Sequence, residues 1–371
     1  MSVNKLFVAG AGCGKTTFIV EKALQMKDRN ILITTYTINN EENIKNKIIE
    51  KNGFIPSNIN ILRWFSFLIH YGANPYLYYF FNDIDKINGF YFSENTNYYL
   101  PHDDKRYYFT DDNKIRSCSL SEFVFRCNKK SNNKVINRLE NIFNTIFIDE
   151  VQDMSGYDLN IIELLCNSSI NLCLVGDLRQ RVYKTNRSNK NSSKINNKSY
   201  NYNIHDYIKK YFINCKIDEK QLNKSYRNSK EICNFATKLY PNYSKIEYTF
   251  EYNKKDGGIF FIEKNKDKIN KYLELHPNNI IQLRFSKNSS SDFINTSFPV
   301  LNFGAVKGLE YDRVIIFLTD GLIKILKNQD TREYSENKAK LYVAITRARY
   351  SVVFITDEDL TEYGVKKFSF D

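Results

Sequence analysis

The sequence predicts an α/β protein in which two parallel-sheet domains follow one another along 371 residues. Two patterns support this prediction: ten short runs of β-branched and aromatic residues, and the helix-length segments that separate them. Runs that are apolar throughout indicate strands that are buried on both faces of a sheet. Ten such strands are too many for one small sheet, and the chain is long enough for two or three domains. We therefore expect two sheets in series.

The expected strands form two groups of five. The first group is KLFVA (5–9), NILITT (30–35), NINIL (58–62), NTIFID (144–149) and NLCLVG (171–176). The second group is GIFFIE (258–263), NIIQLRF (279–285), FPVLNF (298–303), RVIIFL (313–318) and SVVFIT (351–356). Residues 73–134 interrupt this alternation without a clear period, which indicates a small insertion between strands of the first domain.

Residues 178–205 are a second interruption, with seven basic residues and no acidic one. This segment is typical of a solvated loop, and the same loop would also suit contacts to nucleic-acid phosphates. The whole chain carries 54 Lys and Arg against 42 Asp and Glu, a net charge of +12. That excess favours a polyanionic partner.

The composition excludes several classes of protein. The seven cysteines have no C-x-x-C spacing and the four histidines are scattered, so a disulfide framework or a zinc site is not expected. The longest apolar run, at 61–69, is too short for a transmembrane helix, and no signal peptide precedes the first strand. We expect a soluble, reduced, cytoplasmic protein.

The strongest motif is AGAGCGKT, which directly follows the first strand and opens a helix. Small residues allow backbone N–H groups to surround phosphates, and the start of a helix adds positive potential. Lys15 would reach the β- and γ-phosphates of a nucleotide, and the Thr16 hydroxyl would hold Mg²⁺. The expected nucleotide-binding residues here are Ala9, Gly10, Ala11, Gly12, Cys13, Gly14, Lys15, Thr16 and Thr17.

A second motif, TIFIDEVQD (145–153), places two carboxylates at the end of a strand. Asp149 would hold Mg²⁺, and Glu150 would orient and deprotonate the attacking water. An acidic strand end can also be merely solvated, but the phosphate loop upstream favours the functional interpretation. Lys15, Asp149 and Glu150 together predict hydrolysis of a nucleoside triphosphate.

Beyond these two motifs, the chain resembles the UvrD/Rep/PcrA-like superfamily 1A helicases. The phosphate loop has that family's form, and six further segments follow in the family's order. They are TTYTINNEENIKNKI (34–48), IDEVQD (148–153), LVGDLRQRVY (174–183), LNKSYRNSKEI (222–232), KGLEYDRVII (307–316) and KLYVAITRAR (340–349). The resemblance implies two RecA-like domains that use ATP and Mg²⁺.

The resemblance also implies roles for matched residues. Gln180 would sense the γ-phosphate, and Arg227 and Arg347 would be arginine fingers. Tyr226 would stack on the nucleotide base, and Glu310 would contact the ribose. The nucleic-acid residues implied are Thr35, Tyr36, Trp64, Tyr183 and Lys307. For Trp64, core packing remains an equal alternative.

The resemblance further implies domain boundaries and a reduced set of elements for separating nucleic-acid strands. Residues 1–72 with 135–205 would form the first RecA-like domain, 73–134 a small accessory insertion, and 206–371 the second domain. Thr185 stands where the family has a Trp on the strand path, and Asn302 and Gly304 replace a Thr and a His. The residues for hydrolysis are intact, whereas the parts that separate strands are reduced.

Two functional hypotheses follow. The first is an ATP-dependent translocase or helicase on single-stranded DNA, moving 3′→5′ as the family does, with RNA still open as an alternative track. The second is a regulatory ATPase subunit in DNA repair or anti-phage defence that controls a partner nuclease. This second hypothesis draws on a likeness to the compact helicase-like subunit of the Gabija anti-phage system. A nucleotide-binding scaffold without turnover is disfavoured by the presence of Glu150, Arg227 and Arg347.

Overall fold

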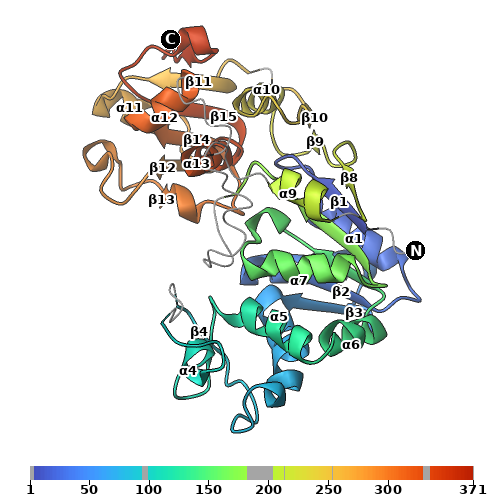
Figure 1. Cartoon of the computed structure of the whole chain (residues 1–371). Helices are drawn as coiled ribbons and strands as arrows, with labels where there is room; N and C mark the ends of the chain where they lie inside the picture. Colours follow the sequence, from blue (N-terminus) through green and yellow to red (C-terminus); the bar gives the residue numbers. More distant parts are fainter. Residues whose placement is uncertain are drawn as a thin grey trace. The chain divides into compact units, whose positions relative to one another are not determined.

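The computed structural model describes residues 4–93, 99–181, 204–212, 214–252, 254–328 and 335–370. The chain divides into two compact units (Figure 1). The first contains Met1–Val8, Lys15–Gly176 and Tyr183–Asp218, and the second contains Ala9–Gly14, Asp177–Val182 and Glu219–Asp371. Each unit is built on a six-stranded sheet whose strands are all parallel, so the predicted α/β class with two parallel sheets is confirmed.

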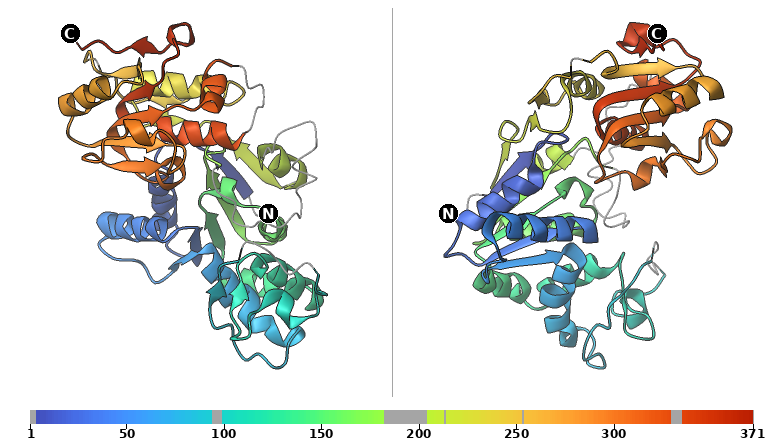
Figure 2. Two further views of the ribbon diagram at one scale, coloured as in Figure 1. Left: turned by 90° about the vertical axis from the view of Figure 1, so that its left-hand side faces the viewer. Right: turned by 180° about the vertical axis from the view of Figure 1, so that it is seen from behind.

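The first sheet has the strand order β3-β2-β6-β7-β1-β8. Its strands are β3 (Ile59–Arg63), β2 (Ile31–Thr35), β6 (Thr145–Ile148), β7 (Asn171–Gly176), β1 (Asn4–Val8) and β8 (Cys215–Asp218). In Figure 2, α1 (Lys15–Gln25) and α2 (Ile38–Asn52) cover one face, and α7 (Tyr157–Cys166) covers the other. Right-handed crossovers require this division, because the chain moves across the sheet first in one direction and then in the other.

Local sequence sets the limits of α2. The Thr37 hydroxyl accepts a hydrogen bond from the Asn40 N–H (3.1 Å), which caps the start of the helix. Gly53 ends it in the left-handed conformation (φ 83°), and its N–H donates to the Ile49 carbonyl at 2.7 Å. The same two signals are visible in the sequence as Thr before and Gly after the helix.

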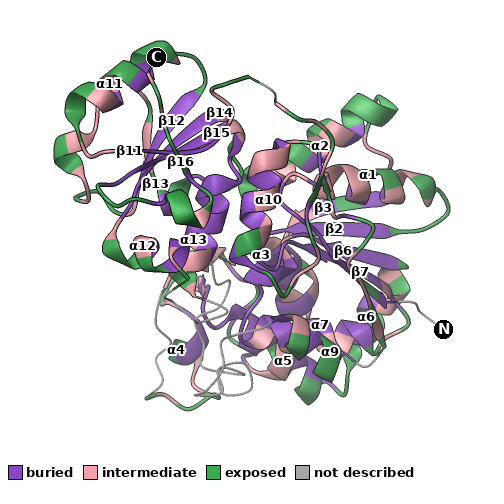
Figure 3. Ribbon diagram, turned by 90° about the horizontal axis from the view of Figure 1, so that it is seen from above, coloured by how far each residue is buried: buried purple, intermediate pink, exposed green. Residues whose placement is uncertain are grey.

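The second sheet has the order β13-β12-β14-β15-β11-β16. Its strands are β13 (Val300–Asn302), β12 (Ile280–Arg284), β14 (Tyr311–Phe317), β15 (Ala348–Ile355), β11 (Gly258–Ile262) and β16 (Lys366–Lys367). The surrounding helices are α10 (Lys230–Leu239), α11 (Lys266–Leu275), α12 (Asp320–Leu326) and α13 (Glu336–Ile345). Figure 3 shows the central strands buried; α11 and α12 have several exposed residues, whereas α10 and α13 are largely buried. Ile269, Tyr272 and Leu273 of α11 pack into a core with residues of β11, β12, β14 and β15.

The first unit continues past the expected boundary at residue 205. The helix α9 (Ile204–Tyr211) leads into β8, which pairs with β1 at the edge of the first sheet. Each of the ten expected strands is present, with ends that differ by up to three residues. The two remaining sheet strands, β8 and β16, had no apolar pattern to reveal them.

The insertion has a small aromatic core of its own. Phe81, Tyr108, Phe109 and Phe123 are buried, and the rings of Tyr108 and Phe123 lie 5.0 Å apart. Aromatic pairs at this separation stabilise beyond the apolar area that they bury. Its elements and neighbours are α3 (Trp64–Phe67), η1 (Leu68–Ala73), η2 (Asn74–Tyr79), β4 (Phe90–Tyr91), α4 (Lys105–Tyr108), β5 (Ile115–Arg116), α5 (Leu120–Lys130) and α6 (Lys134–Ile142).

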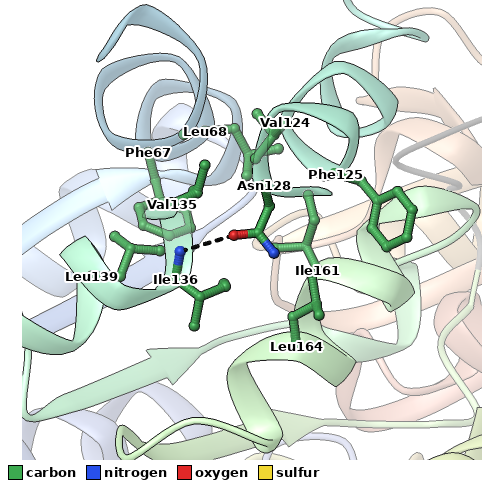
Figure 4. A pocket seen from close by; sticks show the side chains of 11 residues that line it. Phe67, Leu68, Val124, Phe125, Asn128, Val135, Ile136, Leu139, Ile161 and Leu164 are labelled. Atoms are coloured by element: carbon green, nitrogen blue, oxygen red, sulfur yellow. Dashed lines mark hydrogen bonds between the residues drawn. The ribbon is translucent and has the colours of Figure 1, made fainter. Parts of the chain in front are cut away.

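A small apolar cavity lies between η1, α5, α6 and α7. Figure 4 shows its lining side chains, among which Asn128 accepts a hydrogen bond from the Ile136 N–H at 3.2 Å. Its volume of about 10 Å³ is at the lower limit for a single water molecule, and its walls are almost entirely apolar. The cavity is therefore a packing gap and not a ligand site. In the described part of the chain, no helix is both long and apolar enough to cross a membrane.

The remaining short elements connect these layers. They are η3 (Val151–Asp153), β9 (Lys224–Ser225), β10 (Glu247–Tyr248), η4 (Ser291–Phe293), η5 (Phe303–Ala305) and η6 (Thr361–Tyr363). The strands β9 and β10 form a separate two-stranded parallel sheet, and β4 pairs with β5 in the same way.

Candidate functional site

The phosphate loop runs from the end of β1 to the start of α1. Gly12 and Gly14 have φ values of +71° and +74°, which side-chain-bearing residues rarely adopt. A Cβ added at Gly12 would lie only 2.6 Å from the Arg227 Cβ and from the Ser225 Oγ. Glycine is thus required at this position both for its backbone conformation and for the close approach of neighbouring atoms.

Backbone hydrogen bonds hold this loop within the second unit. The Gly10 N–H donates to the Leu222 carbonyl, and the Tyr226 N–H donates to the Gly12 carbonyl, both at 2.9 Å. The Tyr226 ring is 66% exposed and would lie 4.0 Å from a Cβ at Gly14. An exposed ring beside a phosphate loop is well placed to stack on a nucleotide base.

The two candidate catalytic groups of the first unit contact each other. The Lys15 ammonium lies 3.2 Å from Glu150 Oε1, and both side chains are largely buried (14% and 13% exposed). The Gln152 amide donates to the other oxygen of the Glu150 carboxylate. Glu150 itself has a left-handed backbone conformation (φ 56°), which is costly for a residue with a side chain and is found at functional sites.

Asp149 is almost fully buried at the end of β6. Its N–H donates to the Thr34 carbonyl, and its Oδ1 accepts the Glu150 N–H, both at 2.9 Å. Thr16 lies in the first turn of α1. A carboxylate and a hydroxyl are hard oxygen donors of the kind that Mg²⁺ prefers, so these two residues fit the expected ion. The described residues contain no cluster of three or more His, Cys, Asp or Glu that would hold a metal by protein ligands alone.

Gln180 and Arg347 are hydrogen-bonded to each other in the second unit. The Arg347 Nη2 donates to Gln180 Oε1 at 3.4 Å, and the Gln180 Nε2 donates to Asp177 Oδ2 at 2.9 Å. Both residues are buried. Asp177 also accepts a hydrogen bond from the Tyr342 hydroxyl at 3.1 Å.

Arg227 and Glu310, which the family resemblance assigned to the γ-phosphate and the ribose, form an ion pair. The Arg227 Nε lies 2.8 Å from Glu310 Oε2, and the Arg349 Nε lies 3.7 Å from the other carboxylate oxygen. Glu310 therefore orients the Arg227 guanidinium in this structure, a contact that the sequence did not predict. A ribose contact for Glu310 stays a prediction.

The expected nucleic-acid residues differ in their surroundings. Tyr36 is partly exposed after β2, and burial together with Asp158 and Asp153 raises the pKa of its hydroxyl. Trp64 is fully buried, and its indole N–H donates to Asp158 Oδ1 at 2.6 Å, so the packing alternative describes it better than base stacking.

The surroundings of Thr35, Lys307 and Tyr183 give little support for a nucleic-acid contact. Thr35 is also fully buried, and its hydroxyl has no hydrogen-bond partner among the described residues. Lys307 is partly exposed and precedes Gly308 in the second unit. Tyr183 and most of the basic segment 178–205 lie outside the described residues.

A row of aromatic rings extends from Tyr36 into the insertion. Tyr36 packs edge-on against Phe65 (5.5 Å between centroids), Phe65 against Phe90 (6.0 Å), and Phe90 against Phe92 (4.9 Å). Phe92 is 73% exposed, and Tyr91 beside it is also exposed. We call Tyr36, Phe65, Phe90 and Phe92 the aromatic row. Phe65 is buried, Tyr36 and Phe90 are partly exposed, and Phe92 is exposed, so bases of any sequence could stack at the two ends of the row but not along all of it.

Several residues of the site could not be identified from the sequence. Gln152 and Asp177 stand inside matched motifs, but spacing alone gave no reason to choose them. Tyr342 also lies in a matched motif, yet its partners are distant in sequence. Phe90 and Phe92 belong to a segment without periodicity, and the frequent Tyr and Phe of this chain conceal them.

Residues 105–200 match the model of the UvrD/REP helicase N-terminal domain. This segment is similar to that domain. It includes Asp149, Glu150, Gln152 and Gln180, and it confirms the resemblance that the ordered motifs predicted. No curated protein matches the chain.

Several solved structures are similar to the chain at low identity. Arterivirus nonstructural protein 10 (helicase) has 13% identity and a TM-score of 0.48, and covers 97% of this chain. Its complex with DNA has the same identity, TM-score and coverage. PRRSV helicase has 14% identity, a TM-score of 0.47 and 95% coverage. This chain spans 61%, 63% and 52% of those chains respectively, which is less than two thirds of their length.

Proposed function

We propose that this chain is an ATP-dependent translocase on single-stranded DNA that moves 3′→5′ and has limited unwinding activity. One observation carries the proposal: the Glu150 carboxylate lies between the Lys15 ammonium and the Gln152 amide, next to the buried Asp149. A carboxylate held beside a phosphate-loop lysine is suited to orient and deprotonate a water molecule.

The resting ion pair suggests how ATP would start the reaction. Phosphate oxygens would draw the Lys15 ammonium away from Glu150, which leaves the carboxylate available to the attacking water. Arg227 and Arg347 would then stabilise the negative charge that spreads over the γ-phosphate oxygens. Mg²⁺ held by Thr16 and Asp149 would neutralise phosphate charge. Hydrolysis would end these contacts with the γ-phosphate and so drive movement along the strand.

We propose a revised boundary between the two RecA-like domains. The first would comprise residues 1–72 and 135–218, because β8 pairs with β1 in the first sheet. The insertion would comprise 73–134, and the second domain 219–371. Under this proposal the exposed end of the aromatic row lies on the insertion.

Tyr36 and Phe92, the two ends of the aromatic row, would hold the strand by base stacking. Tyr36→Ala is expected to weaken the apparent affinity for single-stranded DNA by about 1–3 kcal/mol, because one stacking surface is lost. More DNA would then be needed to stimulate ATP hydrolysis. Phe92→Ala is expected to have an effect in the same range, and neither change should alter hydrolysis without DNA. DNA concentration series of the ATPase rate measure this effect.

Phe54→Ala is the matched control, because Phe54 is an exposed aromatic of the same unit outside the aromatic row. An unchanged DNA dependence in both Tyr36→Ala and Phe92→Ala would remove the row from the strand path.

Displacement of streptavidin from biotinylated single-stranded DNA tests movement itself. A 3′→5′ translocase removes streptavidin from the 5′ end of the oligonucleotide and leaves it on the 3′ end, with ATP required. Removal from the 3′ end alone would reverse the proposed polarity. Removal from neither end, in a protein that hydrolyses ATP, would contradict the translocase proposal.

A second candidate is a regulatory ATPase subunit that controls a partner nuclease. The small insertion favours it, because a motif set complete for hydrolysis is combined with few elements for separating strands. Purification of the native protein decides between the candidates: a stoichiometric nuclease whose activity follows the nucleotide state supports the second one. A single purified chain that moves on DNA would contradict it.

A further inference from the structure

A buried hydrogen-bond network in the second unit centres on Asp177. This residue has no exposed surface, and each of its carboxylate oxygens accepts hydrogen bonds. Oδ2 accepts the Tyr342 hydroxyl at 3.1 Å and the Gln180 Nε2 at 2.9 Å. Oδ1 accepts the Arg179 N–H at 3.2 Å, and the Arg179 guanidinium lies 3.6 Å from the same oxygen.

The network reaches the phosphate loop at two points. The Tyr342 hydroxyl oxygen accepts the Ala11 N–H at 3.4 Å. The Arg179 Nη1 donates to the Ala9 carbonyl at 3.4 Å, and its Nη2 donates to the Ser244 carbonyl at 2.6 Å. Two residues bound to Asp177 thus also bind the backbone of the loop.

The other end of the network is Arg347. Its Nη2 donates to Gln180 Oε1, and its Nη1 donates to the Leu309 carbonyl at 3.3 Å. An ionised Asp177 can only accept hydrogen bonds, so the Gln180 Nε2 must face it. The Gln180 Oε1 then necessarily points toward Arg347, and Asp177 determines which way the Gln180 amide is oriented.

The burial of the Asp177 carboxylate constrains how its neighbours are arranged. A buried carboxylate is costly unless it is paired and hydrogen-bonded, and Arg179 and Tyr342 provide that compensation. Burial, followed by the charge of Asp177, raises the pKa of the Tyr342 hydroxyl well above its usual range. The hydroxyl therefore stays protonated and donates to Asp177 while its oxygen accepts from Ala11.

We propose that Tyr342 and Asp177 are positioning residues that couple the phosphate loop to Gln180 and Arg347. This inference rests on the proposed ATPase function, in which Gln180 and Arg347 act at the γ-phosphate. The coupling runs from Ala11 through the Tyr342 hydroxyl and the Asp177 carboxylate to the Gln180 amide. A change in the loop on nucleotide binding then reaches Gln180 through three hydrogen bonds and Arg347 through a fourth.

Tyr342→Phe tests the coupling, because it removes the hydroxyl and keeps the ring. We expect faster amide hydrogen exchange at residues 9–14 and 177–181 in the nucleotide-free protein. We also expect kcat for ATP to fall about tenfold, with KM changed less than about twofold, because the lost hydrogen bonds orient a catalytic group and do not bind the nucleotide. In a Gln180→Ala background, adding Tyr342→Phe should lower kcat by less than about twofold.

Tyr272→Phe is the matched control. Tyr272 is another buried tyrosine of the second unit, hydrogen-bonded to Ser351 and outside the network. The Tyr272→Phe substitution should leave both amide hydrogen exchange at residues 9–14 and 177–181 and kcat for ATP unchanged.

Three results would overturn the coupling: exchange in Tyr342→Phe that matches wild type, equal effects in Tyr272→Phe, or a full tenfold loss that persists in Gln180→Ala. A wild-type protein without ATP hydrolysis would instead refute the proposed function, and the exchange comparison would still decide whether the network holds the loop.

Discussion

Glu150→Gln is expected to bind ATP with nearly unchanged affinity and to hydrolyse it at least about 100-fold more slowly than the wild-type chain. The amide keeps the size of the side chain and can still accept a hydrogen bond, but it cannot take a proton from water. The left-handed backbone at Glu150 and its contacts with Lys15 and Gln152 hold the carboxylate in one orientation. A fixed carboxylate of this kind contributes mainly to the chemical step.

The measurement is a steady-state phosphate-release assay beside a binding titration with ATP. Glu50→Gln serves as the control, because Glu50 is exposed on α2 of the same unit. Hydrolysis in Glu150→Gln at the wild-type rate would contradict the assignment of Glu150 as the general base.

Lys15→Ala is expected to weaken ATP binding by about 100-fold. This second large effect is on nucleotide affinity, whereas Glu150→Gln affects the rate of hydrolysis. The ammonium would provide charge-assisted hydrogen bonds to phosphate oxygens, and its loss also leaves Glu150 without its cationic neighbour at 3.2 Å. The uncompensated carboxylate would then repel the nucleotide phosphates. Binding and hydrolysis should fall together, unlike in Glu150→Gln.

A titration with a fluorescent ATP analogue measures the affinity, and circular dichroism verifies that the variant is folded. Lys27→Ala is the control, because Lys27 is exposed just beyond the end of α1. ATP affinity within about threefold of wild type in Lys15→Ala would show that the loop does not bind phosphates as proposed.

The sheets were predictable because their central strands are buried on both faces. Residues 31–33 of β2 and 314–317 of β14 are apolar throughout, and this pattern is visible without any partner. β8 and β16 contain Lys-Ile-Asp and Lys-Lys and become strands only through pairing with β1 and β11 at sheet edges. The sequence therefore predicts a boundary at 205, whereas the pairing of β8 leads us to propose one at 218.

The site could be predicted wherever its residues are close in sequence. The phosphate loop and the Asp149–Glu150 pair are local motifs with a strand before them and needed no tertiary information. The contacts between Tyr342 and Asp177, 165 residues apart, and between Trp64 and Asp158, 94 residues apart, depend on the fold. The resemblance implied a nucleic-acid role for Trp64 with core packing as an equal alternative, and the buried indole, hydrogen-bonded to Asp158, favours packing.

The aromatic row shows a further limit of sequence reasoning. With 27 Tyr and 27 Phe in the chain, no single ring in residues 73–134 stands out. Only the fold brings Phe90 beside Phe65 and so continues the series of ring contacts that begins at Tyr36.

The most direct test of the account is the ATPase rate with and without single-stranded DNA, double-stranded DNA and single-stranded RNA at low salt, with Glu150→Gln as the blank. We expect strong stimulation by single-stranded DNA that weakens as salt rises, because phosphate contacts release counterions. Stronger stimulation by RNA would support an ATP-dependent translocase that moves on RNA and not on DNA. Hydrolysis at the same rate with and without every nucleic acid would contradict the claim that this chain is a nucleic-acid translocase.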